Sequence, residues 1–367
     1  PCTASLMNGE LILDTGAMRR TCRWRDGLLF GGRLEIPGKG VGWDLREDLS
    51  DLSLPGLPEE GTDGSFAVED VPATPRAPAH RVAVVTVRLG ILEVQRRFRL
   101  YPNCPAIACD VLLRGDASGL SWRSATLNEA DLRNIESAAA AAEGQAVDTT
   151  LLRLGLPGRH WRVRAVQFRD VTDRNNSLVE EVSLLPYRGG KRLVGNLLFA
   201  SDIVNGGGLF LVKEAPCSGV QLSYPGADFV VSHGEVRVLG AGVETSDLSR
   251  EAWTPCYGTV LGVHDGSEKG QLTALRDYQL RLRTHREGRD RSIMMNTWGD
   301  RGQDSRIEAE FCLAELAAGA RLGITHFQLD DGWQAGRSSN SAFGGGSLEN
   351  IWENLFPAEQ QRLVRLL

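Results

Sequence analysis

Two adjacent carboxylates follow a short apolar segment late in the sequence. Residues 326–333 read His-Phe-Gln-Leu-Asp-Asp-Gly-Trp. Side chains alternate along a strand, so a turn at the strand's end is needed for both Asp330 and Asp331 to face one cleft. Carboxylates accept hydrogen bonds from hydroxyl groups, and the indole of Trp333 offers an apolar face to ring carbons. The segment therefore predicts a pocket for a polyhydroxylated ring, which is sugar chemistry.

A second polar strand end precedes this one. Residues 292–298 read as a buried strand that ends in Asn-Thr-Trp, and residues 324–330 read as the next strand. A helix between them makes the two strands parallel, so their polar ends lie on the same side. In a (β/α)₈ barrel that side is the face where active sites are built, and an open doubly wound sheet would bind ligands at the same edge.

The helix that joins these strands has clear sequence signals at both ends. Ser305 and Glu308 form a capping box that predicts its start, and Gly323 predicts its end. The apolar stripe expected to face the strands consists of Ile307, Phe311, Ala314, Ala318 and Leu322.

Composition excludes several classes of protein. The formal net charge of −6, without a basic run, argues against a nucleic-acid partner. No apolar stretch approaches the roughly 20 residues that span a membrane. The seven cysteines are an odd number and widely spread, so free thiols are expected, which favours a reducing, cytoplasmic compartment over a disulfide scaffold. No cofactor and no metal site is predicted. A Mg²⁺ site at the two aspartates is disfavoured because no phosphate loop or third acid is near.

The chain of 367 residues divides into unlike parts. Residues 1–263 show short alternating segments and turns, such as 83–89 and 93–100 around Gly90, which predict a large antiparallel β-sandwich (a supersandwich). Residues 264–290 predict a linking helix with Leu272, Leu275 and Leu282 on one face. Residues 291–367 predict the first βα units of a (β/α)₈ TIM barrel. They can form only part of one, because a whole barrel needs roughly 250 residues.

The two strand ends and the helix between them resemble the melibiase group, the α-galactosidases of glycoside hydrolase family 36. The resemblance rests on Met-Asn-Thr-Trp-Gly-Asp at 295–300, Ala-Gly-Ala at 318–320 and Leu-Gly-Ile-Thr-His-Phe-Gln-Leu-Asp-Asp-Gly-Trp at 322–333. Weaker resemblance extends to residues 224–226 and 253–262, where the family's large sandwich meets its barrel. The specific match covers about forty residues.

This resemblance implies a retaining α-glycosidase that hydrolyses terminal α-galactosides through a glycosyl-enzyme. By resemblance, Asp330 and Asp331 hold the hydroxyls at positions 4 and 6 of the ring in subsite −1, and Trp298 and Trp333 wall that subsite. Asp300 either reaches the cleft or caps the following helix. Both catalytic aspartates are expected on later barrel strands beyond Leu367, so no catalytic residue is assigned and the chain is interpreted as part of a longer hydrolase.

Other interpretations stay open beside this one. Asp-Asp-Gly is also typical of a turn or a helix start, and both tryptophans could be core residues. Galactosyl transfer, as in raffinose synthases, would use the same strand motifs, and the sandwich alone could be a non-catalytic carbohydrate-binding protein. The expected partner in each case is an oligosaccharide or glycoside, and the exposed edges of an incomplete barrel favour a homo-oligomer.

Asp330 and Asp331 are rejected as the catalytic pair. Retention requires two carboxyl groups roughly 5–5.5 Å apart on opposite sides of the scissile bond. Sequence neighbours at one strand end would approach the sugar from the same side.

Overall fold

The computed structural model of the chain describes residues 2–122, 148–158, 160–168, 179–186, 188–297 and 307–330. Contacts divide the chain into two compact units, Pro1–Thr284 and His285–Leu367, and each is described by itself.

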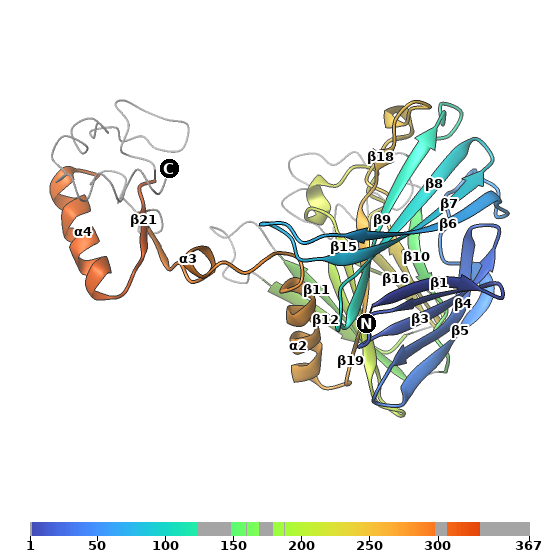
Figure 1. Ribbon diagram of the computed structural model, residues 1–367, viewed down its shortest axis with the longest axis horizontal. Coiled ribbons are helices and arrows are strands. Elements are labelled where there is room, and N and C mark those ends of the chain that lie inside the picture. The colour runs from blue at the N-terminus through green and yellow to red at the C-terminus, as the bar shows by residue number, and fades with distance from the viewer. Residues whose placement is uncertain are drawn as a thin grey trace. The chain divides into compact units, whose positions relative to one another are not determined.

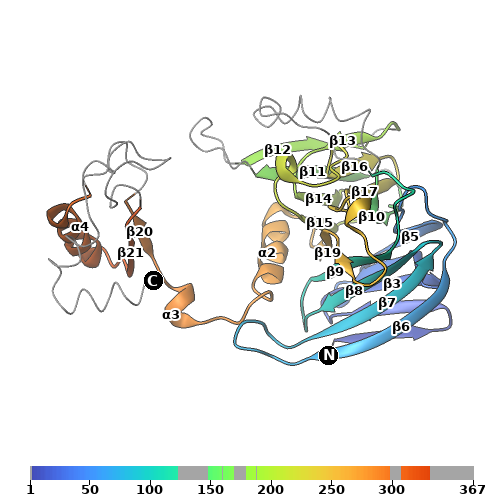
Figure 2. The same ribbon diagram turned by 90° about the horizontal axis from the view of Figure 1, so that it is seen from above.

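Antiparallel sheets make up the first unit (Figures 1 and 2). The five-stranded sheet consists of β1 (Thr3–Met7), β2 (Glu10–Asp14), β3 (Arg19–Arg25), β4 (Leu28–Ile36) and β5 (Val41–Ser50). The four-stranded sheet consists of β10 (Thr150–Leu154), β17 (Glu235–Leu239), β16 (Phe229–Ser232) and β13 (Lys191–Leu193).

The largest sheet has ten strands. Its order is β12 (Val179–Leu184), β11 (Trp161–Phe168), β14 (Leu197–Asp202), β15 (Gly208–Glu214), β19 (Gly258–His264), β9 (Ala106–Gly115), β8 (Leu92–Leu100), β7 (His80–Leu89) and β6 (Thr62–Val71), with β18 (Thr254–Pro255) beside β9. Short 3₁₀ turns lie at η2 (Ser218–Val220) and η3 (Thr245–Asp247).

One apolar core joins the three sheets. Its cluster includes Leu34 of the five-stranded sheet, Phe98 of the ten-stranded sheet and Val238 of the four-stranded sheet. Ser53, in the loop after β5, forms an isolated bridge with Thr150 of β10. Residues of both smaller sheets share the core cluster with residues of the ten-stranded sheet. The predicted β-sandwich is therefore confirmed.

Strand alternation predicted β8 and its hairpin well. Leu92, Val94, Phe98 and Leu100 are buried, and Gly90 takes φ +57° in the turn to β7. The segment 83–89, which also alternates, lies within β7.

The inward face of β8 nevertheless contains a charge. Arg96 is 2% exposed and donates to both carboxylate oxygens of Asp51, at 2.6 and 2.9 Å. Arg20 donates to the same carboxylate at 2.7 Å. The arginines hold the pKa of Asp51 below its ordinary value, against the effect of burial. Pairing with Asp51 therefore allows an arginine to be buried in the core, where an unpaired arginine would be strongly destabilising.

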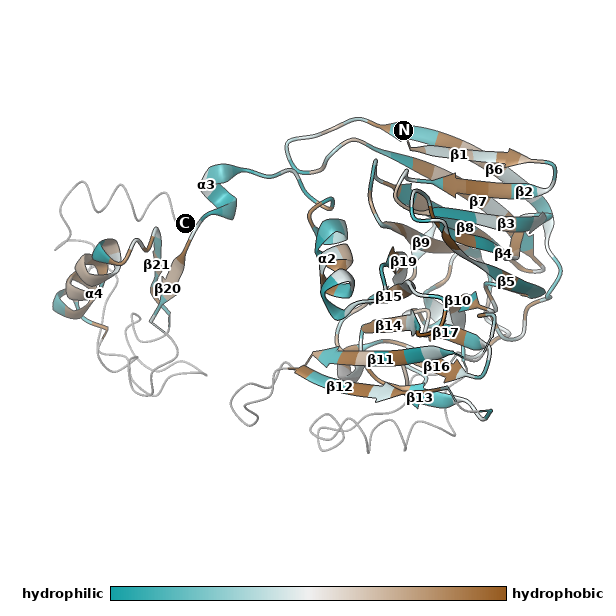
Figure 3. Ribbon diagram, turned by 90° about the horizontal axis from the view of Figure 1, so that it is seen from below, coloured by the Kyte–Doolittle hydropathy of each residue, from teal (hydrophilic) through white to brown (hydrophobic). Residues whose placement is uncertain are grey.

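The helix after the sandwich, α2 (Glu268–Gln279), buries a different face from the predicted one. Its buried residues are Gln271, Ala274 and Tyr278, whereas Leu272 is 59% exposed. The physical reason is hydrogen bonding, since Tyr278 donates to Glu214 Oε1 at 2.8 Å and Gln271 donates to Ser201 Oγ at 3.0 Å. The helix carries both hydrophilic and hydrophobic residues (Figure 3).

The division between the units also differs from the sequence-based boundaries. It follows Thr284, so α2 lies within the first unit instead of forming a linker over 264–290. A short helix, α3 (Glu287–Asp290), begins the second unit.

The second unit contains the predicted β–α–β unit. It consists of β20 (Met294–Asn296), α4 (Ala309–Arg321) and β21 (His326–Gln328), and β20 pairs with β21 in parallel. The two polar strand ends therefore lie on the same side, as expected. The remainder of a barrel is not among the described residues and stays a prediction.

The start of α4 was predicted wrongly. The N-cap is Glu308, and the structure describes no capping hydrogen bond from its side chain, while Ser305 lies outside the described residues. Ile307 is instead 2% exposed and shares a buried cluster with Cys312. These are the positions before the N-cap and four after it, where a hydrophobic staple fixes the entry of the chain into a helix.

The predicted stripe on α4 was also partly wrong. Cys312 and Gly319 are buried, Ala314 is exposed and Leu322 is 79% exposed. Leu322 lies at the C-cap, one residue beyond the last helical residue, Arg321.

The predicted end of α4 is confirmed. Gly323 takes φ +80°, its N–H donates to Ala320, and the N–H of Ile324 donates to Gly319 at 2.9 Å. This is the Schellman pattern, in which a residue with positive φ satisfies the last helical carbonyls.

Candidate functional site

The candidate site lies where β20 and β21 end side by side. Asn296 is opposite Gln328 in the parallel register, and the N–H of Thr297 donates to the Gln328 carbonyl at 3.2 Å. The last ladder bond thus extends one residue past β20 and fixes the spacing between the two strand ends.

Asp330 is held from two sides at this edge. Its carboxylate Oδ2 accepts a hydrogen bond from Asn296 Nδ2 at 3.0 Å, and its backbone N–H donates to Thr297 Oγ1 at 2.9 Å. Thr297 is 4% exposed and Asp330 is half-buried. Backbone and carboxylate are therefore both oriented, so the acid is positioned before a ligand arrives.

The other predicted site residues lie outside the described residues. They are Asp331, Trp333, Trp298 and Asp300. The structure thus places one of the five, Asp330, and the roles of the other four stay predictions.

Asn296 and Thr297 are site residues that the sequence argument did not single out. Their signal was present, because Asn-Thr directly follows an apolar strand. What the sequence did not provide was their pairing with a residue more than thirty positions later, which depends on the parallel register.

A close contact between α4 and β20 supports this edge. A side chain at Gly319 would place its Cβ 3.1 Å from Met295 Cε, so glycine lets the helix approach the strand. Beneath the strand ends, Cys312 and Phe327 are buried. Burial raises the pKa of the Cys312 thiol to about 11, so this thiol is a packing group rather than a nucleophile.

A second polar cluster, centred on Lys213 and Asp228, lies in the first unit. Lys213 Nζ donates to Asp228 Oδ1 at 2.9 Å and to Gln221 Oε1 at 2.5 Å. Asp228 Oδ2 accepts from Gly195 N at 2.8 Å and from Ser218 Oγ at 2.7 Å.

This Lys213–Asp228 cluster is structural rather than catalytic. Both charged side chains are 0% exposed, so no substrate reaches them. Burial lowers the pKa of Lys213 below its ordinary value, while Asp228 opposes that change. The bonds tie residues 216–221 to β15 and to the start of β16.

The described residues offer no grouping of three or more His, Cys, Asp or Glu side chains that could hold a metal ion. None of the helices they form is long and apolar enough to cross a membrane. No disulfide links the seven cysteines, all of which lie in the part of the chain that the structure describes.

The fold of this chain is similar to the folds of several solved structures. The α-galactosidase AgaB of glycoside hydrolase family 36, from Geobacillus stearothermophilus, matches with a TM-score of 0.57 and 13% identity over 100% of this chain and 55% of that chain. AgaA, from the same organism and family, matches with a TM-score of 0.54 and 11% identity over 89% and 50% of the two chains. The galactosidase domain of the α-galactosidase–sucrose kinase AgaSK matches with a TM-score of 0.53 and 11% identity, over 96% of this chain and 55% of that chain.

These neighbours agree with the family resemblance seen in the sequence. At such low identity the likeness shows the fold, and the chain spans about half the length of these structures. No protein-family model and no curated protein matches the sequence.

Proposed function

We propose that this chain is part of a retaining α-glycosidase that hydrolyses terminal α-galactosides, and that it supplies residues of subsite −1. The observation that carries the proposal is Asp330, held by Asn296 and Thr297 at the carboxyl ends of two parallel strands. The fold neighbours support the proposal, since structures of AgaA variants contain raffinose and stachyose.

An oriented carboxylate suits the binding of a sugar. Hydroxyl groups donate to a charged acceptor, and each such hydrogen bond contributes roughly 1.5–3 kcal/mol. Because Asn296 already fixes the carboxylate, little side-chain freedom is lost when a hydroxyl binds. We propose that Asp331 binds a neighbouring hydroxyl and that Trp298 and Trp333 pack on the ring, with Asp300 at the edge of the cleft.

The nucleophile and the acid–base residue are assigned to neither Asp330 nor Asp331. The two-carboxylate mechanism needs groups on opposite sides of the glycosidic bond. Asp330 is therefore a binding residue that positions the ring for attack by carboxylates from other strands.

Kinetics of the product of the complete encoding gene test the proposal. With an aryl α-galactoside as substrate, the Asp330→Ala variant should lose about ten- to a hundredfold in kcat/KM, since one or two hydrogen bonds to a charged group disappear. Analysis of the first-formed anomer should show retention. Glu310→Gln, an exposed acid on α4, is the matched control and should leave the kinetics unchanged.

Wild-type kinetics in Asp330→Ala would show that Asp330 does not bind the ring. Absence of α-galactosidase activity in the complete gene product would contradict the hydrolase assignment itself. Sucrose added as an acceptor separates hydrolysis from galactosyl transfer, because only a transferase forms the trisaccharide as the main product.

A further inference from the structure

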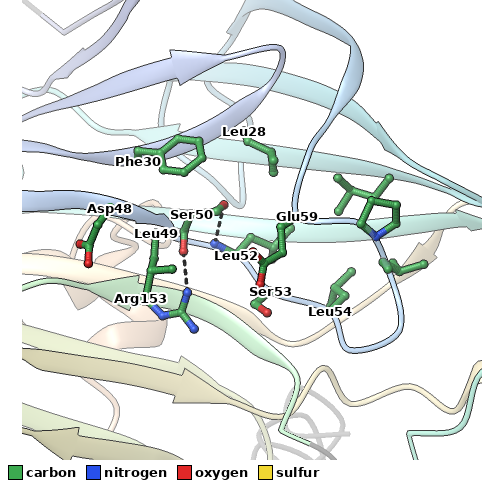
Figure 4. A pocket seen from close by; sticks show the side chains of 13 residues that line it. Leu28, Phe30, Asp48, Leu49, Ser50, Leu52, Ser53, Leu54, Glu59 and Arg153 are labelled. Carbon is green, nitrogen blue, oxygen red and sulfur yellow. Dashed lines mark hydrogen bonds between the residues drawn. The ribbon is translucent and has the colours of Figure 1, made fainter.

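The cavity drawn in Figure 4 is small, and its arginine is already paired. Arg153 donates to the Ser50 carbonyl at 3.1 Å and forms an ion pair with Glu235 at 3.4 Å. The cavity has a volume of about 70 Å³, well below the range of roughly 300–1,000 Å³ that is typical of small-molecule sites. Unused hydrogen-bonding groups are instead expected at the edges of the sheets, where a strand has a neighbour on one side only.

Strand β6 forms one edge of the ten-stranded sheet (Figure 2). It has ten residues, and among the described residues β7 is the strand that pairs with it. In the same part of the chain, β1 approaches both β6 and β7 but forms no backbone pair with either. Eight of the ten side chains of β6 are exposed, while Phe66 and Val71 are half-buried. The backbone groups along its outer side are therefore available to another strand.

β6 lacks the residues that usually keep an edge strand from pairing. It contains no lysine, arginine or proline. Each of its three acids is paired with an arginine of β7 or β8. These pairs are Asp63 with Arg88 at 3.2 Å, Glu69 with Arg97 at 2.7 Å and Asp70 with Arg81 at 2.8 Å. The edge therefore presents acids that are already neutralised within the same sheet, so it repels a second acidic edge only weakly.

The sequence of β6 is complementary to itself in one antiparallel register. With Ala67 on a two-fold axis, Ser65 lies opposite Glu69 of the other copy, and Phe66 lies opposite Val68 of the other copy. Small or apolar residues then face one another or a paired acid along the whole regular part of the strand, which begins after a bulge between Thr62 and Ser65.

Neighbouring registers are less favourable. A shift of one or two residues in one direction places Asp63 opposite Asp70 or Glu69, and like charges directly opposite each other are destabilising. A shift of one residue in the other direction places the ring of Phe66 opposite Glu69. The charge pattern of the strand therefore selects the register centred on Ala67.

This register also extends the apolar core. Phe66 packs against the core cluster, and it is opposite Val85 in β7. Val68 is opposite the buried Ala83 but is itself 40% exposed. Pairing would cover Val68 with Phe66 of the other copy, and the removal of apolar surface from water favours association.

We propose that β6 is an interface at which a second copy of this chain adds its own β6 in antiparallel register, joining the ten-stranded sheets of two copies across a two-fold axis. The proposal goes beyond the hydrolase function, because it rests on the first unit alone and involves no catalysis. The interface also differs from the edges of an incomplete barrel, from which a homo-oligomer was expected.

Disulfide cross-linking of the complete gene product tests the register. Ala67→Cys places the thiols of two copies opposite each other, where the Cβ atoms of paired residues are about 4.5–5.5 Å apart and a small adjustment allows a disulfide. Val71→Cys on the same strand is the matched control, because the two copies of this residue lie at opposite ends of the interface. Mild oxidation should give a reducible covalent dimer in Ala67→Cys, and not in Val71→Cys or in the parent protein.

Sedimentation equilibrium tests the strength of the interface. Val68→Lys places a charge opposite Phe66 twice in each dimer, so the dissociation constant should rise at least about tenfold. Val179→Lys is the matched control, since Val179 is a similarly exposed valine on β12, the other edge strand of the same sheet. Urea unfolding of each variant checks that the fold is retained.

The proposal is overturned if Ala67→Cys forms no more covalent dimer than Val71→Cys, or if Val68→Lys associates as tightly as Val179→Lys. A gene product that stays monomeric at all concentrations would also overturn it, and would indicate that another part of the longer protein covers β6. None of these measurements depends on glycosidase activity, so the interface and the hydrolase assignment can fail separately.

Discussion

Replacing Lys213 by methionine tests whether its buried ion pair supports the sandwich. Lys213 and Asp228 are both 0% exposed, and Nζ lies 2.9 Å from Oδ1. Methionine has a similar length and no charge, so the variant leaves Asp228 buried without its cation. Asp228 would retain bonds from Gly195 and Ser218, which lessen but do not remove the cost.

The expected magnitude follows from the burial of both partners. Removing one member of a buried pair destabilises a protein by about 3–5 kcal/mol, because an uncompensated charge remains in the interior. The double variant Lys213→Met/Asp228→Asn removes both charges and keeps an oxygen that accepts from Gly195 and Ser218. Its cost should be smaller than the sum of the single costs by about 2 kcal/mol.

Urea unfolding followed by circular dichroism of the strand-rich first unit measures these costs. Lys191→Met, at an exposed position on β13, is the matched control and should shift the free energy of unfolding by less than about 0.5 kcal/mol. A cost below about 1 kcal/mol for Lys213→Met, or strictly additive costs in the double variant, would refute the argument that this pair acts as a buried unit.

Three further predictions concern single positions. Burial lowers the pKa of His264 to about 4 from 6.5. Between these two pH values the imidazole is protonated in the unfolded chain but stays neutral in the native protein. The free energy of unfolding should therefore fall by up to about 3 kcal/mol as the pH drops through this window. Unfolding free energies measured across that window should fall less steeply in His264→Asn than in the exposed control His233→Asn. Gly323→Ala should cost about 1–2 kcal/mol in thermal unfolding because φ is +80° there, whereas Gly288→Ala, without a positive φ, should cost nothing. Cys312 should react with iodoacetamide at pH 7 only after urea unfolding, because its pKa is about 11 and it is buried; rapid alkylation of the native protein would contradict this.

Local patterns predicted the elements of the fold where one interaction dominates. Alternation of apolar side chains fixed the inward face of β8, and a glycine with positive φ ended α4 at the expected residue. These signals work because solvent exclusion and backbone sterics act over a few neighbouring residues. The parallel pairing of β20 with β21 was predictable for a different reason, because a helical crossover between two adjacent strands of one sheet makes them parallel.

Side chains that satisfy polar partners far away were not predictable in this way. Arg96 occupies an inward position of β8 because Asp51, on another segment, neutralises it. The leucines of α2 were expected inward, yet Tyr278 and Gln271 are buried because Glu214 and Ser201 lie beneath them. Such pairings depend on which surfaces meet, and periodicity along one helix or strand contains no information about that.

The candidate site shows the same division between what the sequence predicts and what the packed structure decides. The sequence by itself determined that an aspartate follows a strand end, that an Asn-Thr pair follows the preceding strand, and that both ends share one side. Only the tertiary structure decided that Asn296 holds the carboxylate of Asp330 and that Thr297 holds its backbone. The physical reason is that a hydrogen bond is formed or lost within a few tenths of an ångström, and the register and tilt of two strands set that distance only when the chain is packed.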